Sequence, residues 1–486
     1  MSAAVVLINL SAGGASADVH EWRVHLVARL LRGERLVTLF GRPEGAQVRV
    51  TAVVQDALGE LHATRADVDP KTGFHTLSRE FPSAHVFERE LHEQHGVRVA
   101  DHPWLKPVRF EPQGKIGIDD YPFYKMHGKE THEVQVGPVH AGVIEPGAFR
   151  FSCHGEVVHH LEIHLGYQHR GVERLLLSRD PRTLAPLVEQ IAGDTSVAHT
   201  WAYAAAIESL ARLPDAPERS VPRAAMLELE RVAMHLAGLS GLATDVGFLQ
   251  GSTTYGRLRT TAINASMRLC GSRFGRTAVR PAGSGVSLAA SEVVDLIQRL
   301  DALDADARLI DERFLTSRTV RHRLADTGRV DTDLALQLGL VGQAARASGV
   351  AIDQRANRPG LWAGLPVVTR TSGDCQARAE IRIDELHASI AFLKRLLAQS
   401  PTWNRHHAPV GPLTPNRLVV ALVEGWRGEV VHALETDNDG KLVHYKVQDP
   451  SLRNWMGLAL SLRNNEISDF PICNKSFDLS YCGNDL

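Results

Sequence analysis

The chain has 486 residues, of which 44% are hydrophobic and 23% are charged, and its formal net charge is −2. This length accommodates about two to four domains with well-buried cores. A near-neutral chain lacks the basic face of a nucleic-acid-binding protein, so no nucleic-acid partner is expected. No apolar stretch approaches the roughly 18 residues of a membrane span, so any membrane association is expected to come through partners.

The cysteines also limit the chemistry. They are few and scattered, at positions 153, 270, 375, 473 and 482, and no Cys-x-x-Cys pair occurs. Neither a disulfide framework nor an iron–sulfur cage is therefore expected, and a reducing cytoplasm fits best. The apolar N-terminal segment, residues 3–8, is short and lacks basic residues. It is predicted to be a first strand or a flexible end, and not a signal peptide.

The first part of the chain has the pattern of a small α/β domain. Apolar residues recur at helical spacing over 21–31, and segments 48–54 and 73–77 have the composition of strands. A second helix is predicted to begin near Pro82 and Ser83 and to end at Gly96, a natural C-cap. We expect this domain to span residues 1–112 and a linker rich in Pro, Gly, Asp and Lys to span 113–132.

Two segments of this domain resemble a known signature. The second helix contains Glu88-Arg89-Glu90, and residues 101–107 read Asp-His-Pro-Trp-Leu-Lys-Pro. Together they resemble the small hydrophilic, 30-kDa-type subunit of respiratory complex I, with Asp101 at a position where that family usually has glycine. The alternative for the charged triplet 88–90 is a solvated helix face.

The region from 133 to 486 is predicted to be mostly helical, with a few strands near 133–164 and 419–448. Apolar stripes at helical spacing run through 226–236 and 381–397, and the alanine-rich segment 195–210 suits close helix packing. The predicted fold class is therefore α+β, with a small α/β domain followed by a large, mostly helical domain.

Five ordered segments of this region resemble the large subunit shared by complex I and [NiFe]-hydrogenases: residues 137–140, 165–173, 228–236, 279–283 and 372–378. The resemblance is greatest to energy-converting hydrogenases and to hydrogenase-4- and formate-hydrogenlyase-like large subunits that lack the nickel cysteines. It implies a small iron–sulfur partner that holds a 4Fe-4S cluster, and integral membrane subunits of an ion-translocating arm. It also implies a peripheral place on the cytoplasmic side of the inner membrane.

The metal-binding positions of the hydrogenases are altered in this chain. In those proteins Cys-x-x-Cys-x-x-x-His and Asp-Pro-Cys-x-x-Cys supply four thiolates, and the four positions correspond here to Ala192, Thr195, Ser480 and Gly483. A thiolate-rich metal site cannot be built from a methyl group, two neutral hydroxyls and a glycine. No metal, and no other cofactor bound by this chain alone, is expected. Cys482 lies one residue out of register and is expected to be a small apolar residue near the chain end.

Four polar residues are implied by the resemblance as a proton-handling site: Glu145, Asp194, His199 and Asp478. Two or more carboxylates and an imidazole in one apolar cavity would perturb each other's pKa values, as a proton relay requires. His199 could instead be a hydrogen-bonded core histidine, and Glu145, before Pro146, could be a loop edge. Asp194 ends a loop at a good N-cap position before the helix.

A quinone is the acceptor that the complex I resemblance suggests. The quinone-binding histidine and tyrosine of that family fall near Pro146 and Gly193, so a quinone would need a rebuilt pocket here.

Two other groups of residues have alternative interpretations. His160, Glu162 and His164 share one face of a predicted strand, but their spacing is not that of an established zinc site, so a solvated strand face is expected. Arginines recur in the family-like segments and are expected either to face the iron–sulfur partner or to be ordinary surface charge: Arg170, Arg280, Arg355, Arg358 and Arg378.

The sequence therefore predicts the large subunit of a membrane-associated oxidoreductase that couples electron transfer from an iron–sulfur partner to proton or ion movement. The competing hypothesis is a non-catalytic subunit, whose former active site has become a packed core and which transmits conformational change. A hydrogenase with unusual ligands is a third hypothesis, which metal analysis would settle.

Overall fold

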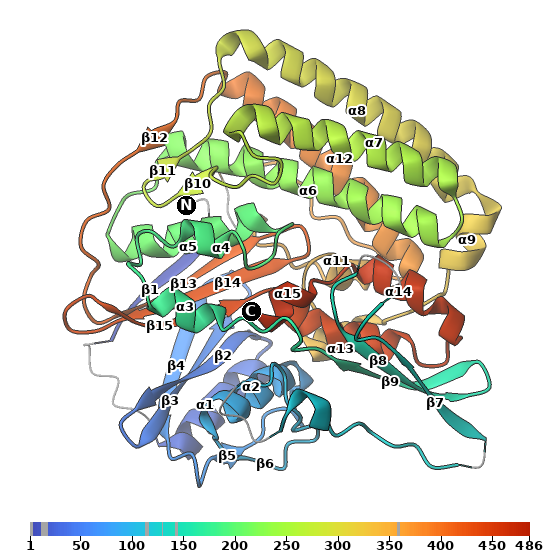
Figure 1. The fold of residues 1–486 in the computed structure, drawn as a ribbon. Helices are drawn as coiled ribbons and strands as arrows, with labels where there is room; N and C mark the ends of the chain where they lie inside the picture. Colours follow the sequence, from blue (N-terminus) through green and yellow to red (C-terminus); the bar gives the residue numbers. More distant parts are fainter. Residues whose placement is uncertain (1–2, 11–17, 112–115, 129, 141–143, 357–359) are drawn as a thin grey trace.

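The computed structural model describes residues 3–10, 18–111, 116–128, 130–140, 144–356 and 360–486. It combines a small strand-rich region at the N-terminus with a larger, predominantly helical region (Figure 1). This confirms the predicted α+β fold class.

The N-terminal region is an antiparallel sheet of β2 (Arg35–Glu44), β3 (Gln47–Gln55) and β4 (Leu61–Val68), packed against α1 (Val19–Leu31) and α2 (His85–His95). The predicted helix at 21–31 and strand at 48–54 are confirmed, whereas 73–77 yields only the short β5 (Phe74–His75), paired with β6 (Val99–Ala100). The helix α2 ends at Gly96 in the left-handed conformation, as predicted.

The triplet Glu88-Arg89-Glu90 is not a solvated face. Glu88 and Glu90 are 0% and 2% exposed. Glu88 accepts hydrogen bonds from Leu77 N–H and from the Ser78 hydroxyl, which satisfy its buried carboxylate. Asp101 has φ 61, a conformation that glycine adopts readily, which accounts for the usual glycine at this position.

A second antiparallel sheet joins the first strand of the chain to three strands from its C-terminal part. Its strand order is β1 (Ala4–Asn9), β13 (Arg417–Glu424), β14 (Glu429–Thr436) and β15 (Leu442–Gln448). Alternate residues of β13 are buried on opposite faces, Val420 against the β2–β4 sheet and Val419 against the helical side. The boundaries 1–112, 113–132 and 133–486 remain a prediction, although β1 pairs with β13 and so lies outside the N-terminal sheet.

Long helices form the largest layer (Figure 1). The helices α6 (Pro217–Asp245) and α7 (Leu249–Cys270) pack together, and α8 (Ala290–Thr316) and α12 (Cys375–Gln399) cover them. Between this layer and the β13–β15 sheet lies α5 (Ser196–Leu210). No helix of the described residues is long and apolar enough to cross a membrane.

The third sheet, β7 (Thr131–Val136), β8 (Ala148–His154) and β9 (Val157–His164), packs against α13 (Ser451–Ser461). The prediction of a solvated strand face for His160, Glu162 and His164 of β9 is wrong. Glu162 and His164 are 4% and 3% exposed, since Lys106 pairs with Glu162 and the Tyr121 ring stacks on His164. Within the described residues no group of three or more potential ligands could hold a metal ion.

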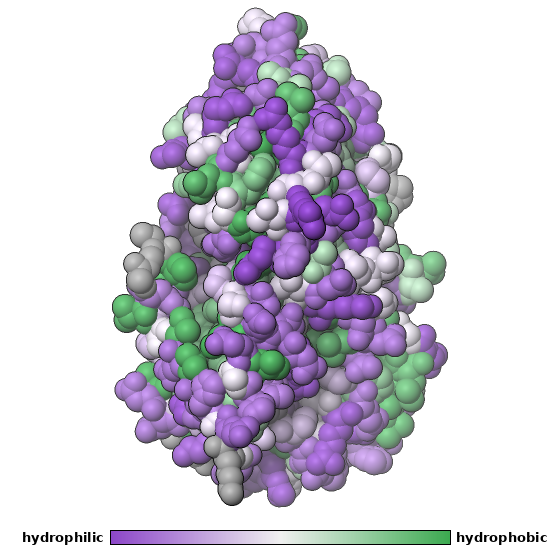
Figure 2. All heavy atoms as spheres, turned by 90° about the vertical axis from the view of Figure 1, so that its right-hand side faces the viewer, coloured by the Kyte–Doolittle hydropathy of each residue, from purple (hydrophilic) through white to green (hydrophobic). Residues whose placement is uncertain are grey.

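The remaining elements are short connections: α3 (Val172–Leu177), α4 (Ala185–Val188), α9 (Arg318–Leu324), α10 (Thr332–Leu338), α11 (Gly342–Ala347), α14 (Phe470–Phe477), α15 (Tyr481–Asp485), β10 (Val279–Arg280), β11 (Gly283–Ser284), β12 (His406–His407), η1 (Pro82–Ala84), η2 (Ile118–Asp120) and η3 (Ile467–Asp469). The face at the right of Figure 1 is predominantly hydrophilic, with hydrophobic side chains in small groups (Figure 2).

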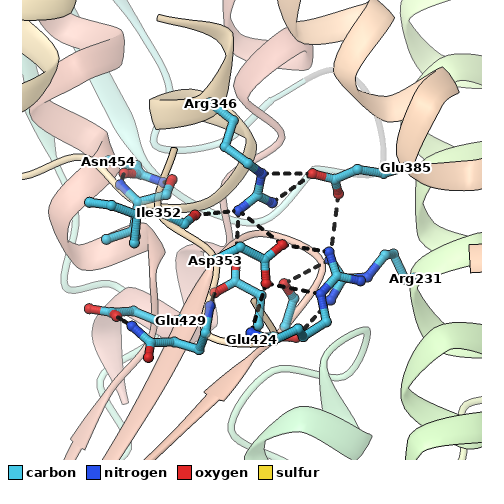
Figure 3. Close-up of polar contacts among 12 residues, drawn as sticks. Arg231, Arg346, Ile352, Asp353, Glu385, Glu424, Glu429 and Asn454 are labelled. Carbon is cyan, nitrogen blue, oxygen red and sulfur yellow. Dashed lines mark hydrogen bonds and ion pairs between the residues drawn. The ribbon is translucent and has the colours of Figure 1, made fainter. Parts of the chain in front are cut away.

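An ion network is buried where the helices meet the sheet (Figure 3). The Arg346 guanidinium binds Glu385 at 2.7 Å and Glu424 at 2.8 Å, and all three side chains are at most 3% exposed. Burial alone would lower the pKa of Arg346, but the charges of Glu385, Glu424 and Asp353 raise it above its ordinary value. The same network includes Arg231, Glu228 and Arg355.

Replacing Arg346 by methionine should cost about 3–5 kcal/mol of unfolding free energy, because Glu385 and Glu424 would each lose a buried cationic partner. Urea unfolding of the purified chain measures this loss of unfolding free energy. The control is Arg308→Met in α8, whose pair with Asp304 is exposed (the Arg308 side chain is 60% exposed) and should contribute less than about 1 kcal/mol. Equal losses in the two variants would contradict the importance of the buried network.

Candidate functional site

The candidate site is built from two turns of the chain, and the first of them, residues 192–195, directly precedes α5. Ala192 and Thr195, two of the former metal positions, are both 0% exposed. The N-cap of α5 is Thr195 and not Asp194, and its side chain does not cap the helix. Glu230 of α6 does so instead, accepting hydrogen bonds from Val197 N–H (2.7 Å) and Ala198 N–H (3.3 Å). Burial raises the pKa of Glu230 to about 8, despite these hydrogen bonds.

The second turn, residues 478–483, joins α14 to α15 near the C-terminal end. Asp478 ends α14 in the left-handed conformation, and Ser480 caps α15 by accepting a hydrogen bond from Gly483 N–H at 2.9 Å. A serine at this former ligand position thus has a structural reason, since serine is a favoured N-cap. The Glu145 carboxylate accepts hydrogen bonds from Tyr481 N–H and Cys482 N–H, both at 3.3 Å.

The two turns are held together by arginines. Arg170 donates to the carbonyl oxygens of Gln190 (2.7 Å), Ile191 (3.0 Å) and Cys482 (2.8 Å), and so bridges the turn before α5 and the C-terminal helix. The expectation that the family-like arginines are surface or interface charge is wrong for two of them, since Arg355 and Arg378 are 4% and 0% exposed. Arg358 lies outside the described residues.

Arg427 connects Asp194 to Asp478. Its guanidinium binds the Asp194 carboxylate through two bonds of 2.6 and 2.7 Å, and its Nε donates to the Asp478 carbonyl oxygen at 2.5 Å. Trp426 lies under the guanidinium, 3.9 Å from the ring centroid, and its Nε1 donates to the Asp194 carbonyl. Burial opposes the charge on Arg427, but Asp194 raises its pKa above the ordinary value. The Asp194 side chain keeps 36% exposure.

Asp449 fills the space beside Gly483, one of the four positions that the resemblance aligns with metal-binding cysteines. A Cβ atom on Gly483 would lie 2.6 Å from Asp449 Cγ and 2.7 Å from Asp449 Oδ2, closer than real Cβ atoms come. A cysteine at 483 would therefore require this buried carboxylate to move. With Ala192, Thr195 and Ser480 at the other positions, the residues present do not fit a nickel–iron centre.

His199 belongs to a buried hydrogen-bonded chain. Its Nε2 lies 3.1 Å from Asp449 Oδ2, its Nδ1 lies 3.1 Å from His432 Nε2, and His432 Nδ1 lies 2.8 Å from the Tyr445 hydroxyl. Burial would raise the pKa of Asp449, but the hydrogen bond from His199 and the charge of Arg427 leave it lowered. Burial lowers the pKa of His432 and raises that of Tyr445.

These pKa directions agree with one polarity of the hydrogen-bonded chain. Asp449 is an anion that only accepts, and Tyr445 is a phenol that can donate to neutral His432. One consistent arrangement follows: Tyr445 donates to His432, His432 to His199, and His199 to Asp449. Every ring nitrogen of the two histidines then has a partner.

The four predicted site residues are only partly brought together. Asp194 and Asp478 share Arg427, and Glu145 lies beside Cys482, whose thiol pKa is raised to about 12 by burial and by Glu145. His199 makes its side-chain hydrogen bonds to His432 and Asp449 and to none of the other three predicted residues.

Sequence reasoning missed Arg427, Asp449, Glu230, His432 and Tyr445. Two of them had a local signal. Arg427 lies in Glu424-Gly-Trp-Arg-Gly-Glu429, whose glycines predict a tight hairpin, and Asp449 precedes Pro450-Ser451, a helix-start pattern. Glu230, His432 and Tyr445 are placed by tertiary packing and had no such signal.

Together, the fused α/β region, the helical layer and the paired turns at α5 and the C-terminus define a large subunit of the complex I and hydrogenase class. The family described as "Respiratory-chain NADH dehydrogenase, 30 Kd subunit" matches residues 17–130, and the "49 Kd subunit" family matches residues 245–412. The chain belongs to this family as a fusion of the two subunit types, and is a subunit of a membrane-associated complex of the complex I and hydrogenase type.

Individual relatives support this family assignment. The chain is 27% identical over 453 residues to formate hydrogenlyase subunit 5 of Escherichia coli, covering 86% of this chain and 78% of the relative. It is 30% identical over 328 residues to one of the subunits of the F(420)H(2) dehydrogenase of Methanosarcina mazei, covering 66% of this chain and 85% of the relative. A chain of the archaeal membrane-bound sulfane sulfur reductase has the same fold, with TM-score 0.66, 23% identity, and coverage of 74% of this chain and 99% of that one.

A Gly483→Ala substitution should destabilise the chain by about 1–3 kcal/mol, because the new methyl group would displace the buried Asp449 carboxylate. Thermal or urea unfolding measures the loss. Gly411→Ala is the control, since a Cβ atom there meets nothing within 4 Å and should change stability by at most about 0.5 kcal/mol. A Gly483→Ala chain as stable as the control would show that the space is not filled.

Proposed function

We propose that the chain is the large subunit of an oxidoreductase complex in which electron arrival at a partner's 4Fe-4S cluster is coupled to proton movement, without a nickel–iron centre. The observation that carries this proposal is the Asp449–His199 pair in the space of a lost metal ligand. A carboxylate and an imidazole exchange protons, whereas the thiolates of the hydrogenase family bind metal.

In this proposal His199 takes up a proton when the neighbouring cluster gains an electron. Asp449 stabilises the imidazolium that forms, because its carboxylate stays ionised beside His199 Nε2. Asp194, Glu145 and Asp478 lie nearer the surface and exchange protons with water or with partner subunits. The complex would attach to the cytoplasmic face of the inner membrane through its membrane-arm subunits, and a quinone would be one acceptor of its electrons.

The second candidate is a structural subunit that transmits conformational change. The complete burial of His199, with both ring nitrogens used, favours this candidate, because a packed and satisfied histidine needs no chemical role. Both candidates share the same partners and differ in whether His199 changes its protonation.

Nickel, iron and quinone should be measured together on the complex purified with its native partners. We expect cluster iron without nickel, because three of the four ligand positions lack a metal-binding side chain of the right kind and Asp449 occupies the space at the fourth. Bound quinone would identify the acceptor, and iron without quinone would leave the proton-coupled proposal with another acceptor. Nickel in stoichiometric amount would overturn the proposal and restore a hydrogenase.

Asp449→Asn tests the proton coupling directly. In the native complex, the midpoint potential of the partner's terminal cluster should fall with rising pH, by up to about 59 mV per pH unit for one proton per electron. A neutral amide at position 449 cannot stabilise an imidazolium at His199, so the slope should flatten. Redox titration by electron paramagnetic resonance at several pH values measures it, and Asp439→Asn, exposed in the β14–β15 turn, is the matched control. An unchanged slope in Asp449→Asn, with only stability altered, would favour the structural subunit.

A further inference from the structure

Two cysteines that take no part in the candidate site lie together between α12 and α14. Cys375 is the first residue of α12, Cys473 lies in α14, and both are 0% exposed. Their sulfur atoms are 3.9 Å apart, within the distance of a hydrogen bond between sulfurs.

The charge of Arg378 indicates that Cys375 is a thiolate. Arg378 is 0% exposed, and no carboxylate among the described residues lies within ion-pair distance of it. Its guanidinium donates to the carbonyl oxygens of Gly373 and Gly328, to Ser476 Oγ, and to Cys375 Sγ at 3.3 Å. A buried cation requires a nearby anion, and the Cys375 sulfur is the ionisable acceptor that it contacts.

Two further features favour the thiolate. Cys375 occupies the first turn of a 25-residue helix, where the positive end of the helix dipole stabilises an anion. The two sulfurs lie within hydrogen-bond distance, and with Cys375 as the anion the Cys473 thiol is the donor. Burial opposes ionisation, but the hydrogen bond from Cys473 and the Arg378 charge lower the pKa of Cys375 to about 6. The pKa of Cys473 is raised by its hydrogen bond to Cys375 and by burial, so Cys473 remains a thiol.

A surface loop contacts the pair. In this loop, between α9 and α10, Ala325, Asp326 and Arg329 are exposed and Gly328 is buried against the two sulfurs. A side chain at 328 would collide with Cys473 Sγ, so a glycine is required here. Local opening of such a loop admits a molecule about the size of water more readily than a bulky reagent.

We propose that Cys375 and Cys473 form an oxidisable dithiol, in which the Cys375 thiolate attacks a small hydroperoxide and Cys473 closes a disulfide between α12 and α14. With hydrogen peroxide, the thiolate takes one oxygen as the O–O bond breaks and becomes a sulfenic acid, and the hydroxide that leaves is protonated to water. The Cys473 sulfur then attacks the Cys375 sulfur and expels a second water. Two electrons pass from the sulfurs to the peroxide, and the sulfurs approach from 3.9 Å to about 2.0 Å.

The oxidised form would alter the C-terminal turn. The disulfide removes the anion that faces Arg378, so this buried guanidinium loses its charge partner. Arg378 also holds Ser476 and lies over the Phe477 ring, directly before Asp478. Oxidation is therefore expected to loosen the end of α14, which carries one of the candidate site residues.

The test treats the full chain, in its native complex, with hydrogen peroxide and follows the thiols by alkylation and peptide mass spectrometry. We expect a Cys375–Cys473 cross-linked peptide that has lost two hydrogens and is restored by a reducing agent. Cys482 is an internal control, because it is more exposed but its pKa is raised to about 12. The buried pair should therefore react before Cys482, and glutathione disulfide should cross-link it much more slowly than peroxide does.

Arg378→Gln should slow the cross-linking at neutral pH by about tenfold or more, because it removes the cation that stabilises the thiolate. Cys270→Ser, a buried cysteine in α7, should leave the rate unchanged. If Arg378→Gln fails to fold, the pH dependence in the unaltered chain decides, since the rate should fall by half near pH 6. Oxidation of Cys482 without a cross-link, or a cross-linking rate that follows an ordinary thiol pKa, would overturn the proposal.

Discussion

Mutual neutralisation of buried charges is the constraint on which the rest of this structure depends. Glu424 ends β13 against Arg346, and Glu429 begins β14 against Arg35 of the N-terminal region. Removing either cation would leave a carboxylate buried at high cost, so the helices, the sheet and the N-terminal region are held in one register. The hairpin loop 425–428 lies between these two glutamates. Its position, and therefore that of Arg427, is fixed from both sides by ion pairs.

The same logic applies at the four positions that the resemblance aligns with metal-binding cysteines. A site built for four thiolates and metal ions would, without them, contain either a cavity or uncompensated polar groups. Here the space at Gly483 holds the Asp449 carboxylate, and Ser480 caps α15. Glu230 satisfies the first N–H groups of α5, which Thr195 does not cap. Hydrogen bonds of Ser480, Asp449 and Glu230 therefore hold the two turns in place.

The sequence predicted the elements better than it predicted the site. Apolar periodicity predicted the helix at 21–31, and the entry and C-cap residues predicted the helix that ends at Gly96, since both are local patterns. The alternative of a solvated helix face is wrong for Glu88 and Glu90, and the expected exposure is wrong for Glu162 and Arg378. Their burial depends on partners far away in the chain, such as Lys106 for Glu162. The motif positions singled out His199 as a candidate, but its partners Asp449 and His432 lie 250 and 233 residues away, beyond any local pattern.

The two halves of the candidate site are joined by charge and not by a direct hydrogen bond. Asp194 keeps 36% exposure and binds Arg427, and the Arg427 charge helps to keep the pKa of buried Asp449 low. A partner subunit that protonates or displaces Asp194 would leave Arg427 more strongly attracted to Asp449. Under the proposed function, Asp449 would then stabilise a protonated His199 less. In that proposal a contact at the surface would act on the buried pair through charge, so the complete burial of His199 does not by itself favour a merely structural residue.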